Sequence, residues 1–527
     1  MTDSSGAVVP GAQVTVSNIH TNIARSGETD AQGQYIFQLL PTGVYRVEVT
    51  SENFKKFIQS GIVLDVGRSA RIDPVLELGT VTESVSVTAD APLVNTTSAV
   101  VGRTVDNVEI TNLPLVNRDV YSLLNLTPGV ESSVSGNAFG FREQRTMISG
   151  SSYQGTGTVN YFLDGGNNTT GLRGPGNAVP NPDAVQEFRV ITNSYGAEFG
   201  RFAGGVIDVV TKSGTNEFHG SLFEFVRNDK LNATTWNATS KPPLRRNQFG
   251  GTFGGPIVQN RSFFFGSYSG LRQREYEFRN SAIVPTALER AGNFSQSPRK
   301  PNGPVTGQPF PNAIIPQDRF DPTARNILDK YIPAANLPGN FVEATQPEPY
   351  DTDEFQMKID HVLTPSHQLT GSYFRDSGKS LESLAGNLIW SQRQFRWTQH
   401  NLNLSDTCTI SPAAINQLRL TYVRNFGGRL NLPEMSLADL GSGFQIQGPP
   451  SLPQIQVSGY FNLNQAIAGP SAGSNYYGIR ETLTWTRGSH SLKFGGDVYL
   501  EKFVHDTTLN NYGTFAFNGT HHGQCSG

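Results

Sequence analysis

The chain has 527 residues, a length that predicts about three or four domains rather than one. Its 41 basic and 44 acidic side chains give a formal net charge of −3, which argues against general nucleic-acid binding. Charged residues make up only 16% of the chain, while 55 Gly and 32 Phe favour a mainly β protein rich in turns. Because no run approaches about 18 apolar residues, the sequence predicts no membrane-spanning helix.

Short alternating segments separated by turns fill the first 80 residues, and they predict a small β-sandwich. The expected strands are 12–17, 35–38, 44–50 and 62–66. The motif PGA at 10–12, followed by Asp30 and Gly33, resembles the carboxypeptidase regulatory-like domain, which implies a prealbumin-like or carbohydrate-binding-like fold. The resemblance also implies a strand before Thr2. Since no export signal is visible either, we expect the chain to be a fragment.

A mixed α/β region is predicted for residues 81–215. It opens with an alternating strand that is expected to link it to the first domain. The expected elements are this strand at 81–88, a short helix at 118–124, a β-like stretch at 148–163, a helical turn at 183–187 and a strand at 205–211.

Six short motifs follow one another in this region. They are LPLVNR (113–118), LTPGV (126–130), FLDGG (162–166), VQEF (185–188), AEFGR (197–201) and TKSGTN (211–216). Together they resemble the plug of TonB-dependent outer-membrane receptors, in particular the Oar-like subgroup that carries an N-terminal regulatory-like domain. The resemblance implies a plug at 81–215 and coupling to an inner-membrane TonB complex.

Beyond residue 216, long segments alternate apolar and polar residues, a pattern typical of outer-membrane β-barrels. Phe355, Met357 and Ile359 share the side that we expect to contact lipid, and the polar residues between them face a wet lumen. The ten expected strands are 218–228, 247–255, 262–273, 352–361, 368–376, 395–409, 416–426, 476–487, 490–501 and 511–518. Barrels with a plugged lumen have about 22 strands, so residues 216–527 predict only the N-terminal part of an antiparallel transmembrane barrel.

The longest insertion in the barrel region, residues 281–350, is rich in Pro, Asn and Gly. Loops of this length are usually functional or disordered, and we expect this one to be extracellular. Within it, Asp321 as N-cap and Pro322 at the first helical position predict a short helix that continues through Lys330.

The candidate functional residues come from the plug motifs: Arg118, Asp164, Gly165, Glu187, Glu198, Arg201 and Lys212. Asp164 is interpreted as a turn former before two glycines, with ligand contact by an apical plug loop as the alternative. The charged residues Arg118, Glu187, Glu198 and Arg201 either pair across the plug–barrel interface or form ordinary surface ion pairs.

Aromatic residues at 263–265 and Tyr268 are interpreted as lipid-facing or girdle side chains, with a substrate platform as the alternative. None of the nine histidines begins a His-x-x-Glu or His-x-x-x-His motif, and we expect no catalytic, cofactor or metal site. Whether Cys408 and Cys525 form a disulfide stays open.

The function that follows is that of an outer-membrane receptor or transporter fragment, which takes up or exports an unidentified substrate by TonB-dependent coupling. Its expected partners are the TonB complex, outer-membrane lipid and an extracellular substrate, with glycans and peptides as candidates. It is expected in the outer membrane of a Gram-negative-type bacterium, with the N-terminal domain in the periplasm. The alternative is a surface adhesion or carbohydrate-binding β-protein without transport, in which the alternating faces pack against one another.

Overall fold

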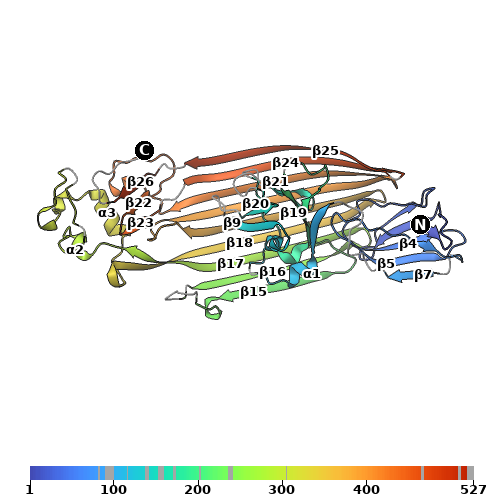
Figure 1. The fold of residues 1–527 in the computed structure, drawn as a ribbon, viewed down its shortest axis with the longest axis horizontal. Coiled ribbons are helices and arrows are strands. Elements are labelled where there is room, and N and C mark those ends of the chain that lie inside the picture. Colours follow the sequence, from blue (N-terminus) through green and yellow to red (C-terminus); the bar gives the residue numbers. More distant parts are fainter. Residues whose placement is uncertain are drawn as a thin grey trace.

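A computed structural model shows a mainly β protein with three parts along its length (Figure 1). The N-terminal domain lies at one end, a long antiparallel sheet forms the middle, and short helices and strands lie at the other end. The structure describes residues 1–80, 84–88, 100–115, 117–136, 142–151, 159–169, 174–200, 203–234, 241, 243–298, 300–303, 306–464, 468–488, 490–508 and 512–518.

The N-terminal domain contains a five-stranded sheet in the order β3-β2-β4-β5-β7 and a parallel pair, β1 and β6. Its strands are β1 Thr2–Asp3, β2 Gln13–Asn18, β3 Ala24–Glu28, β4 Gly43–Thr50, β5 Lys56–Leu64, β6 Val75–Leu76 and β7 Ser84–Thr88. One predicted strand is absent here: residues 35–38 form none, and Tyr35 and Phe37 pack against the domain core from an unpaired segment. The strand predicted at 81–88 is present as β7 over its described residues, but it pairs in parallel with β5 and so extends the N-terminal sheet rather than the central region.

A second five-stranded sheet, which we call the central sheet, has the order β12-β11-β14-β13-β8. Its strands are β8 Val101–Asp106, β11 Val159–Leu163, β12 Gly166–Asn167, β13 Val185–Asn193 and β14 Gly205–Thr211. Strands β11 and β14 are parallel, and the other pairs are antiparallel. A hairpin of β9 Val130–Gly136 and β10 Arg142–Ile148 lies between β8 and β11 in the sequence.

Short helices pack with the central sheet: α1 Asn107–Asn112 and the 3-10 turns η1 Val120–Leu126 and η2 Pro182–Ala184. The helix predicted at 118–124 therefore begins two residues later, because Asp119 caps it by accepting a hydrogen bond from the Tyr121 amide. The predicted helical turn at 183–187 ends at Ala184, because β13 begins at Val185. The core of this region is apolar and includes Leu124, Phe188 and Ile207, and Phe374 from the long sheet completes it.

The long sheet, called the wall below, is an antiparallel meander of nine strands in the order β15-β16-β17-β18-β19-β20-β21-β24-β25. The strands are β15 His219–Asn228, β16 Leu244–Val258, β17 Ser262–Ile283, β18 Phe341–Thr364, β19 His367–Ser383, β20 Gln392–Ser411, β21 Ala414–Leu432, β24 Ala468–Arg487 and β25 His490–Thr508. Nine of the ten predicted barrel strands are thus present in one sheet, although most are longer than predicted. The tenth prediction is wrong, since β26 Thr514–Phe517 pairs in parallel with β22 Gln454–Val457 outside the wall.

Connections at the far end of the wall fold together into a unit that we call the cap. It contains α2 Ala287–Arg290, α3 Pro322–Tyr331, the 3-10 turns η4 Pro311–Ala313, η5 Gln317–Arg319, η6 Pro338–Asn340 and η7 Ala438–Leu440, and the strands β22, β23 Phe461–Leu463 and β26. The predicted helix after Asp321 is confirmed as α3, with the Asp321 side chain accepting from the Ala324 amide. The insertion between β17 and β18 is shorter than expected, because both strands extend into the predicted loop. The cap has its own apolar core, which includes Ile332, Trp390 and Leu452.

The wall exposes apolar side chains on its outer face and buries polar side chains on its inner face, which is the opposite of the arrangement in a soluble protein. Phe355, Met357 and Ile359 are 42%, 41% and 37% exposed, whereas the alternating Glu354, Gln356 and Lys358 are 6%, 1% and 7% exposed. The prediction that apolar and polar residues on this strand face opposite sides is confirmed. The polar face, however, packs against protein rather than facing an open wet lumen.

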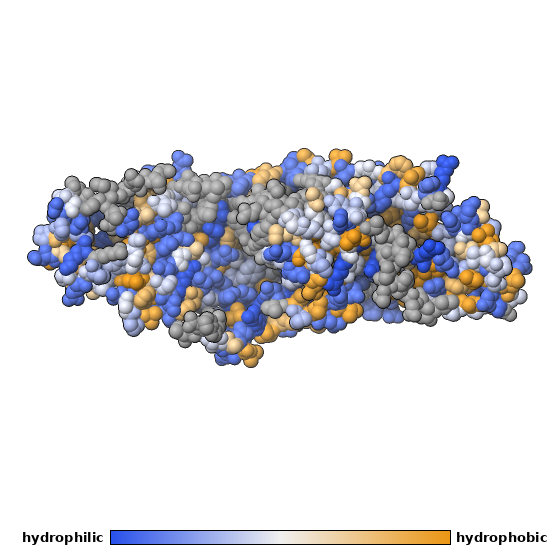
Figure 2. Space-filling view, in the orientation of Figure 1, coloured by the Kyte–Doolittle hydropathy of each residue, from blue (hydrophilic) through white to orange (hydrophobic). Residues whose placement is uncertain are grey.

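Charged pairs limit the apolar outer band on the cap side. Arg272 pairs with Asp353 at 2.8 Å and Arg274 with Asp351 at 2.5 Å, on the outer face next to Phe355. On the molecular face shown in Figure 2, hydrophilic side chains dominate the end that carries the cap. No helix in the described ranges is long and apolar enough to cross a membrane.

Candidate functional site

The candidate site is the interface between the central sheet and the inner face of the wall. Its most buried charged contact joins Lys358 of β18 to Asp164, in the turn between β11 and β12. The Lys358 Nζ lies 3.3 Å from Asp164 Oδ1, and the side chains are only 8% and 5% exposed. Lys358 Nζ also donates to the Thr211 carbonyl at 3.0 Å, and the Thr211 amide donates to Asp164 Oδ1 at 2.9 Å. These contacts fix the FLDGG turn and the end of β14 to one wall strand.

Asp164 adopts a left-handed conformation with a φ of 50°, and Gly165 follows with a φ of 73°. A turn-forming role for Asp164 agrees with this geometry, because aspartate and glycine tolerate positive φ better than other residues. The carbonyl of Gly165 accepts a 2.8 Å hydrogen bond from Arg419 Nη1 of β21. The turn is therefore held by two strands of the wall, β18 and β21.

Side-chain amides of the wall form a second set of contacts, which we call the amide seam. Gln399 donates to the Ala178 carbonyl at 3.1 Å and accepts from the Ala178 amide at 3.2 Å. Asn403 donates to the Leu163 carbonyl at 3.1 Å. The other members are Asn401 with Asn168 at 3.0 Å, Asn425 with Asn177 at 2.8 Å, and Ser267 with Asn181 at 2.9 Å. Because these partners are neutral, separating them exposes groups that water can satisfy without a charge penalty.

A buried carboxyl lies near this seam. Burial raises the pKa of Asp208 in β14 to about 6, and the positive charge of Arg419 opposes that shift. Its Oδ1 is buried and has no hydrogen-bond partner among the described residues. The interface thus contains a buried carboxylate oxygen of Asp208 that accepts no hydrogen bond from the described residues, and Arg419 of the wall interacts with this carboxylate electrostatically.

Arg118 lies where the central region meets the first wall strand. Its guanidinium pairs with Asp183 and is stacked over Phe223 and Phe225 of β15, at 4.7 and 4.0 Å from the ring centroids. The neighbouring Asn117 accepts from Arg246 of β16 at 2.6 Å. Arg118 thus forms its ion pair on its own side of the interface, and it meets the wall through aromatic rings and through an electrostatic interaction with Glu354 of β18.

Glu187 and Arg189 of β13 face the N-terminal domain instead of the wall. Glu187 Oε1 accepts from the Val66 amide at 2.7 Å, and Arg189 donates to the carbonyls of Val66 and Gly67. Burial, reinforced by the charge of Asp65, raises the pKa of Glu187 to about 7. We call this pair of side chains and the segment that they hold the clasp.

Of the remaining candidates, Glu198 pairs with Lys493 of β25 at 2.8 Å, a contact between the central region and the wall. The Lys212 amide donates to the Ala184 carbonyl at 2.9 Å, and burial lowers the pKa of its side chain. Arg201 lies outside the described residues. The structure therefore brings Arg118, Asp164, Gly165 and Glu198 to the wall and Glu187 to the N-terminal domain.

The N-terminal domain also contacts short turns of the wall. Asn22 donates to Asn260 at 2.9 Å in the β16–β17 turn, and Gln38 donates to Thr486 at 2.7 Å next to the β24–β25 turn. The turns β16–β17, β18–β19, β20–β21 and β24–β25 lie at this end, and the connections β17–β18, β19–β20 and β21–β24 contribute to the cap.

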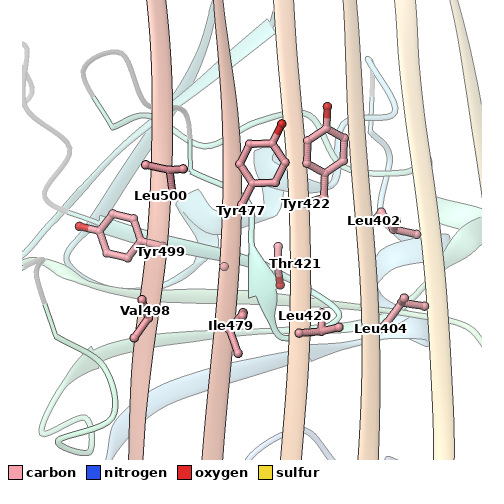
Figure 3. A pocket seen from close by; sticks show the side chains of 11 residues that line it. Leu402, Leu404, Leu420, Thr421, Tyr422, Tyr477, Ile479, Val498, Tyr499 and Leu500 are labelled. Atoms are coloured by element: carbon pink, nitrogen blue, oxygen red, sulfur yellow. The ribbon is translucent and has the colours of Figure 1, made fainter.

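The outer face of the wall carries an open apolar depression of about 410 Å³ across β20, β21, β24 and β25 (Figure 3). Leu420, Ile479 and Val498 form a row across three of these strands, and Tyr422 and Tyr477 lie side by side with ring centroids 5.0 Å apart. Since Leu402 and Leu404 of the same depression alternate with Asn403 of the seam, the depression lies on the opposite side of the wall from the central sheet.

The aromatic group at 263–265 is divided by the same alternation. Phe263 and Phe265 are 1% and 5% exposed on the inner side, so the prediction that they face lipid is wrong. Phe264 contacts Phe218 and Phe253, and Tyr268 is 42% exposed, both on the outer side. The cause is the two-residue period of a strand, which sends neighbouring side chains to opposite faces.

Sequence reasoning missed the amide seam and the anchoring role of Lys358. One signal was available for the seam: Gln399, Asn401 and Asn403 occupy every second position of one strand. A wall that faced water would accept any polar residue at these positions, so three amides in succession indicate contact with protein. For Lys358, the partner is 194 residues away, and no local pattern indicates it.

Comparisons with known proteins agree with this architecture. Residues 210–527 match the family described as outer membrane beta barrel domain, and residues 1–77 match the carboxypeptidase regulatory-like domain. The TonB-dependent transporter Oar of Myxococcus xanthus is 30% identical over 280 residues, which cover 49% of this chain and 25% of that protein. The outer membrane transporter YddB of Escherichia coli is similar in fold, with a TM-score of 0.50 and 12% identity over 76% of this chain and 48% of that one. The matches thus span about a quarter of the curated relative and about half of the solved transporter.

Proposed function

The chain belongs to the outer membrane β-barrel domain family and lies in the outer membrane of a Gram-negative bacterium, and from this premise we propose that it is the plug-bearing part of an energy-coupled transporter. In this proposal the central sheet, within residues 81–215, is the plug, and the wall, within 216–527, is part of the barrel. The N-terminal domain, residues 1–80 with β7, faces the periplasm.

The observation that carries the proposal is the inverted polarity of the wall. Its apolar side chains are exposed on the outside, and its polar side chains are buried against the central sheet. On β18 the stretch from Phe355 to Leu363 spans nine residues, and its outer positions are apolar except for His361. That length is close to the ~9 to 11 residues that a tilted strand needs to cross a bilayer. An adhesion protein would need these faces packed against each other, so the soluble alternative is not favoured.

The orientation follows from the lengths of the connections. Outer-membrane barrels have short periplasmic turns and longer extracellular loops. Two of the short turns contact the N-terminal domain, and the connections β17–β18, β19–β20 and β21–β24 fold into the cap. This supports an extracellular cap, where substrate arrives, and a periplasmic N-terminal domain, where a TonB complex can act.

Opening requires the central sheet to move relative to the wall. The contacts of the central region with the wall include hydrogen bonds between neutral amides and backbone, one buried ion pair, and a more exposed ion pair between Glu198 and Lys493. Such contacts hold the central sheet in a defined position. Water can replace them when a force on the N-terminal domain is transmitted to the central sheet through the clasp. The substrate class is an extracellular solute, with glycans and peptides as the candidates.

Cysteine labelling in cells tests this proposal. In a background with Cys408→Ser and Cys525→Ser, Asn403→Cys places a thiol in the seam, and Leu402→Cys places one on the outer face of the same strand. We expect a membrane-permeant maleimide to label N403C faster in cells with an active TonB system than in cells without a proton-motive force. L402C is the matched control and should be labelled equally in both. Equal labelling of N403C in both conditions contradicts energy-coupled opening.

A further inference from the structure

Three side chains at the N-terminal-domain end of the wall form a connected cluster that transport does not use. Cys408 of β20 lies directly opposite His367 of β19 in the strand register. The Cys408 Sγ is 3.5 Å from His367 Nε2, and His367 Nδ1 is 2.9 Å from Asp406 Oδ2. Sulfur, imidazole and carboxylate therefore lie in the order in which a nucleophile, a base and an orienting acid are found in hydrolytic triads.

The carboxylate determines which imidazole nitrogen carries the proton. An ionised Asp406 can only accept a hydrogen bond, so His367 Nδ1 is the donor and Nε2 presents its lone pair to the thiol. The second oxygen of Asp406, Oδ1, is buried and has no hydrogen-bond partner within the described ranges. Its negative charge is thus available to stabilise an imidazolium formed when the thiol loses its proton.

This geometry does not suit a metal ion. Asp406 contacts the nitrogen that points away from the sulfur, so the three groups do not converge on one point. No group of three or more His, Cys, Asp or Glu side chains among the described residues could hold a metal ion. The cluster is better suited to proton transfer from sulfur to nitrogen.

The cluster is accessible from outside the wall. It shares the outer face with Leu369 and Leu418, which flank Asp406 in the register. Cys408 and His367 lie nearer to the turns than these two leucines. The side chains of His367 and Asp406 are 38% and 31% exposed. Asn416 lies opposite Cys408 on β21 and donates to Glu481 at 2.9 Å, so the polar groups on that side are an amide and a second carboxylate.

We propose that Cys408, His367 and Asp406 form an activated thiol site that reacts with disulfides at the periplasmic edge of the outer membrane. His367 Nε2 takes the proton from Cys408, and the thiolate attacks one sulfur of a disulfide. A new S–S bond forms to Sγ, the original S–S bond breaks, and the leaving thiolate takes the proton back from the imidazolium. The disulfide is the only co-reactant, and the product is a mixed disulfide between this chain and a periplasmic thiol. The chemistry of the site is independent of the transport proposed above, and its periplasmic location rests on the orientation proposed there.

Reactivity of the purified full-length chain in detergent tests this site. With Cys525→Ser, Cys408 is the only thiol of the chain. The probe is the aromatic disulfide 5,5′-dithiobis(2-nitrobenzoate). The reaction rate is measured from the release of its coloured thiolate at several pH values between about 5.5 and 8.5. We expect the rate at about pH 6 to fall roughly tenfold in His367→Gln. Asp406→Asn should shift the pH profile of the rate towards that of an isolated thiol.

His361→Gln is the matched control, because His361 is also a wall histidine at this end but bonds to Ser262 at 2.7 Å. It should leave the rate unchanged, and each variant should retain heat-modifiable gel migration as a sign of a folded barrel. If H367Q reacts as fast as the parent at every pH while folded, the site does not exist. A parent rate that follows only the profile of an isolated thiol overturns the proposal equally.

Discussion

Lys358 in the wall and Asp164 in the central sheet are separated by 194 residues in the chain, yet their side chains form a buried ion pair of 3.3 Å. The pair is completed by Thr211, which donates to Asp164 and accepts from Lys358. One lysine therefore connects a barrel strand, the FLDGG turn and the end of β14.

Loss of one partner of this pair should loosen the central sheet. Lys358→Met leaves a buried carboxylate without its cation, and we expect a loss of about 3–5 kcal/mol, measured as faster hydrogen exchange of the β14 amides. Adding Asp164→Asn should recover part of the loss, since asparagine retains the positive φ and removes the unpaired charge. Arg274→Ala is the control, because its pair with Asp351 is half exposed at the arginine and should contribute at most about 1 kcal/mol. If the β14 amides of K358M exchange no faster than those of R274A, Lys358 does not have this role.

The clasp should depend on pH through Glu187. Its pKa in the folded protein is raised from 4.5 to about 7, so the folded state binds the proton more tightly than the unfolded state. The stabilisation is therefore complete below about pH 4.5 and is lost as the pH rises through about 7, by an amount of the order of 1–3 kcal/mol. Thermal unfolding of the N-terminal domain at pH 5 and pH 8 should show this difference in the parent chain. In Glu187→Gln it should be much smaller, because the amide oxygen still accepts from Val66 without titrating; an unchanged pH dependence in E187Q argues against Glu187 as its source.

The cap should unfold separately from the wall. Trp390 is 7% exposed, its ring meets that of Tyr331 edge-on at 5.5 Å, and its Nε1 donates to the Asn464 carbonyl. Trp390→Ala should cost the cap about 3–5 kcal/mol and expose residues 284–340 to protease, while the barrel keeps its heat-modifiable migration. Leu288→Ala, at a side chain 38% exposed, should have little effect. Joint loss of cap and wall in W390A would show instead that they form a single cooperative unit.

A charge on the outer face distinguishes lipid from water. Leu420 is 41% exposed in the apolar depression, and Leu420→Lys should destabilise the inserted protein by about 2–4 kcal/mol. Asn416→Lys, on the same face of the same strand but next to the turn, should cost about 0–1 kcal/mol. Unfolding from lipid bilayers by urea measures both. Equal, negligible effects would indicate that water covers this face.

Local sequence patterns were sufficient to predict the elements that interactions within a few residues determine. The two-residue rhythm identified nine wall strands and their polar and apolar faces, because every strand of a sheet alternates its side chains regardless of its partners. The limits of β14 and the start of α3 after Asp321 were predicted for the same reason, since a glycine, a cap or a proline acts on its own segment.

Partners distant in the sequence were decided only by the tertiary structure. Nothing local indicates that β26 leaves the wall to pair with β22, or that β7 joins the N-terminal sheet, because a strand can pair with any free edge that the fold presents. The same holds for Lys358 with Asp164. A polar residue on an inner face is compatible with water or with protein, and the packing of the central sheet against the wall determines which of the two it meets.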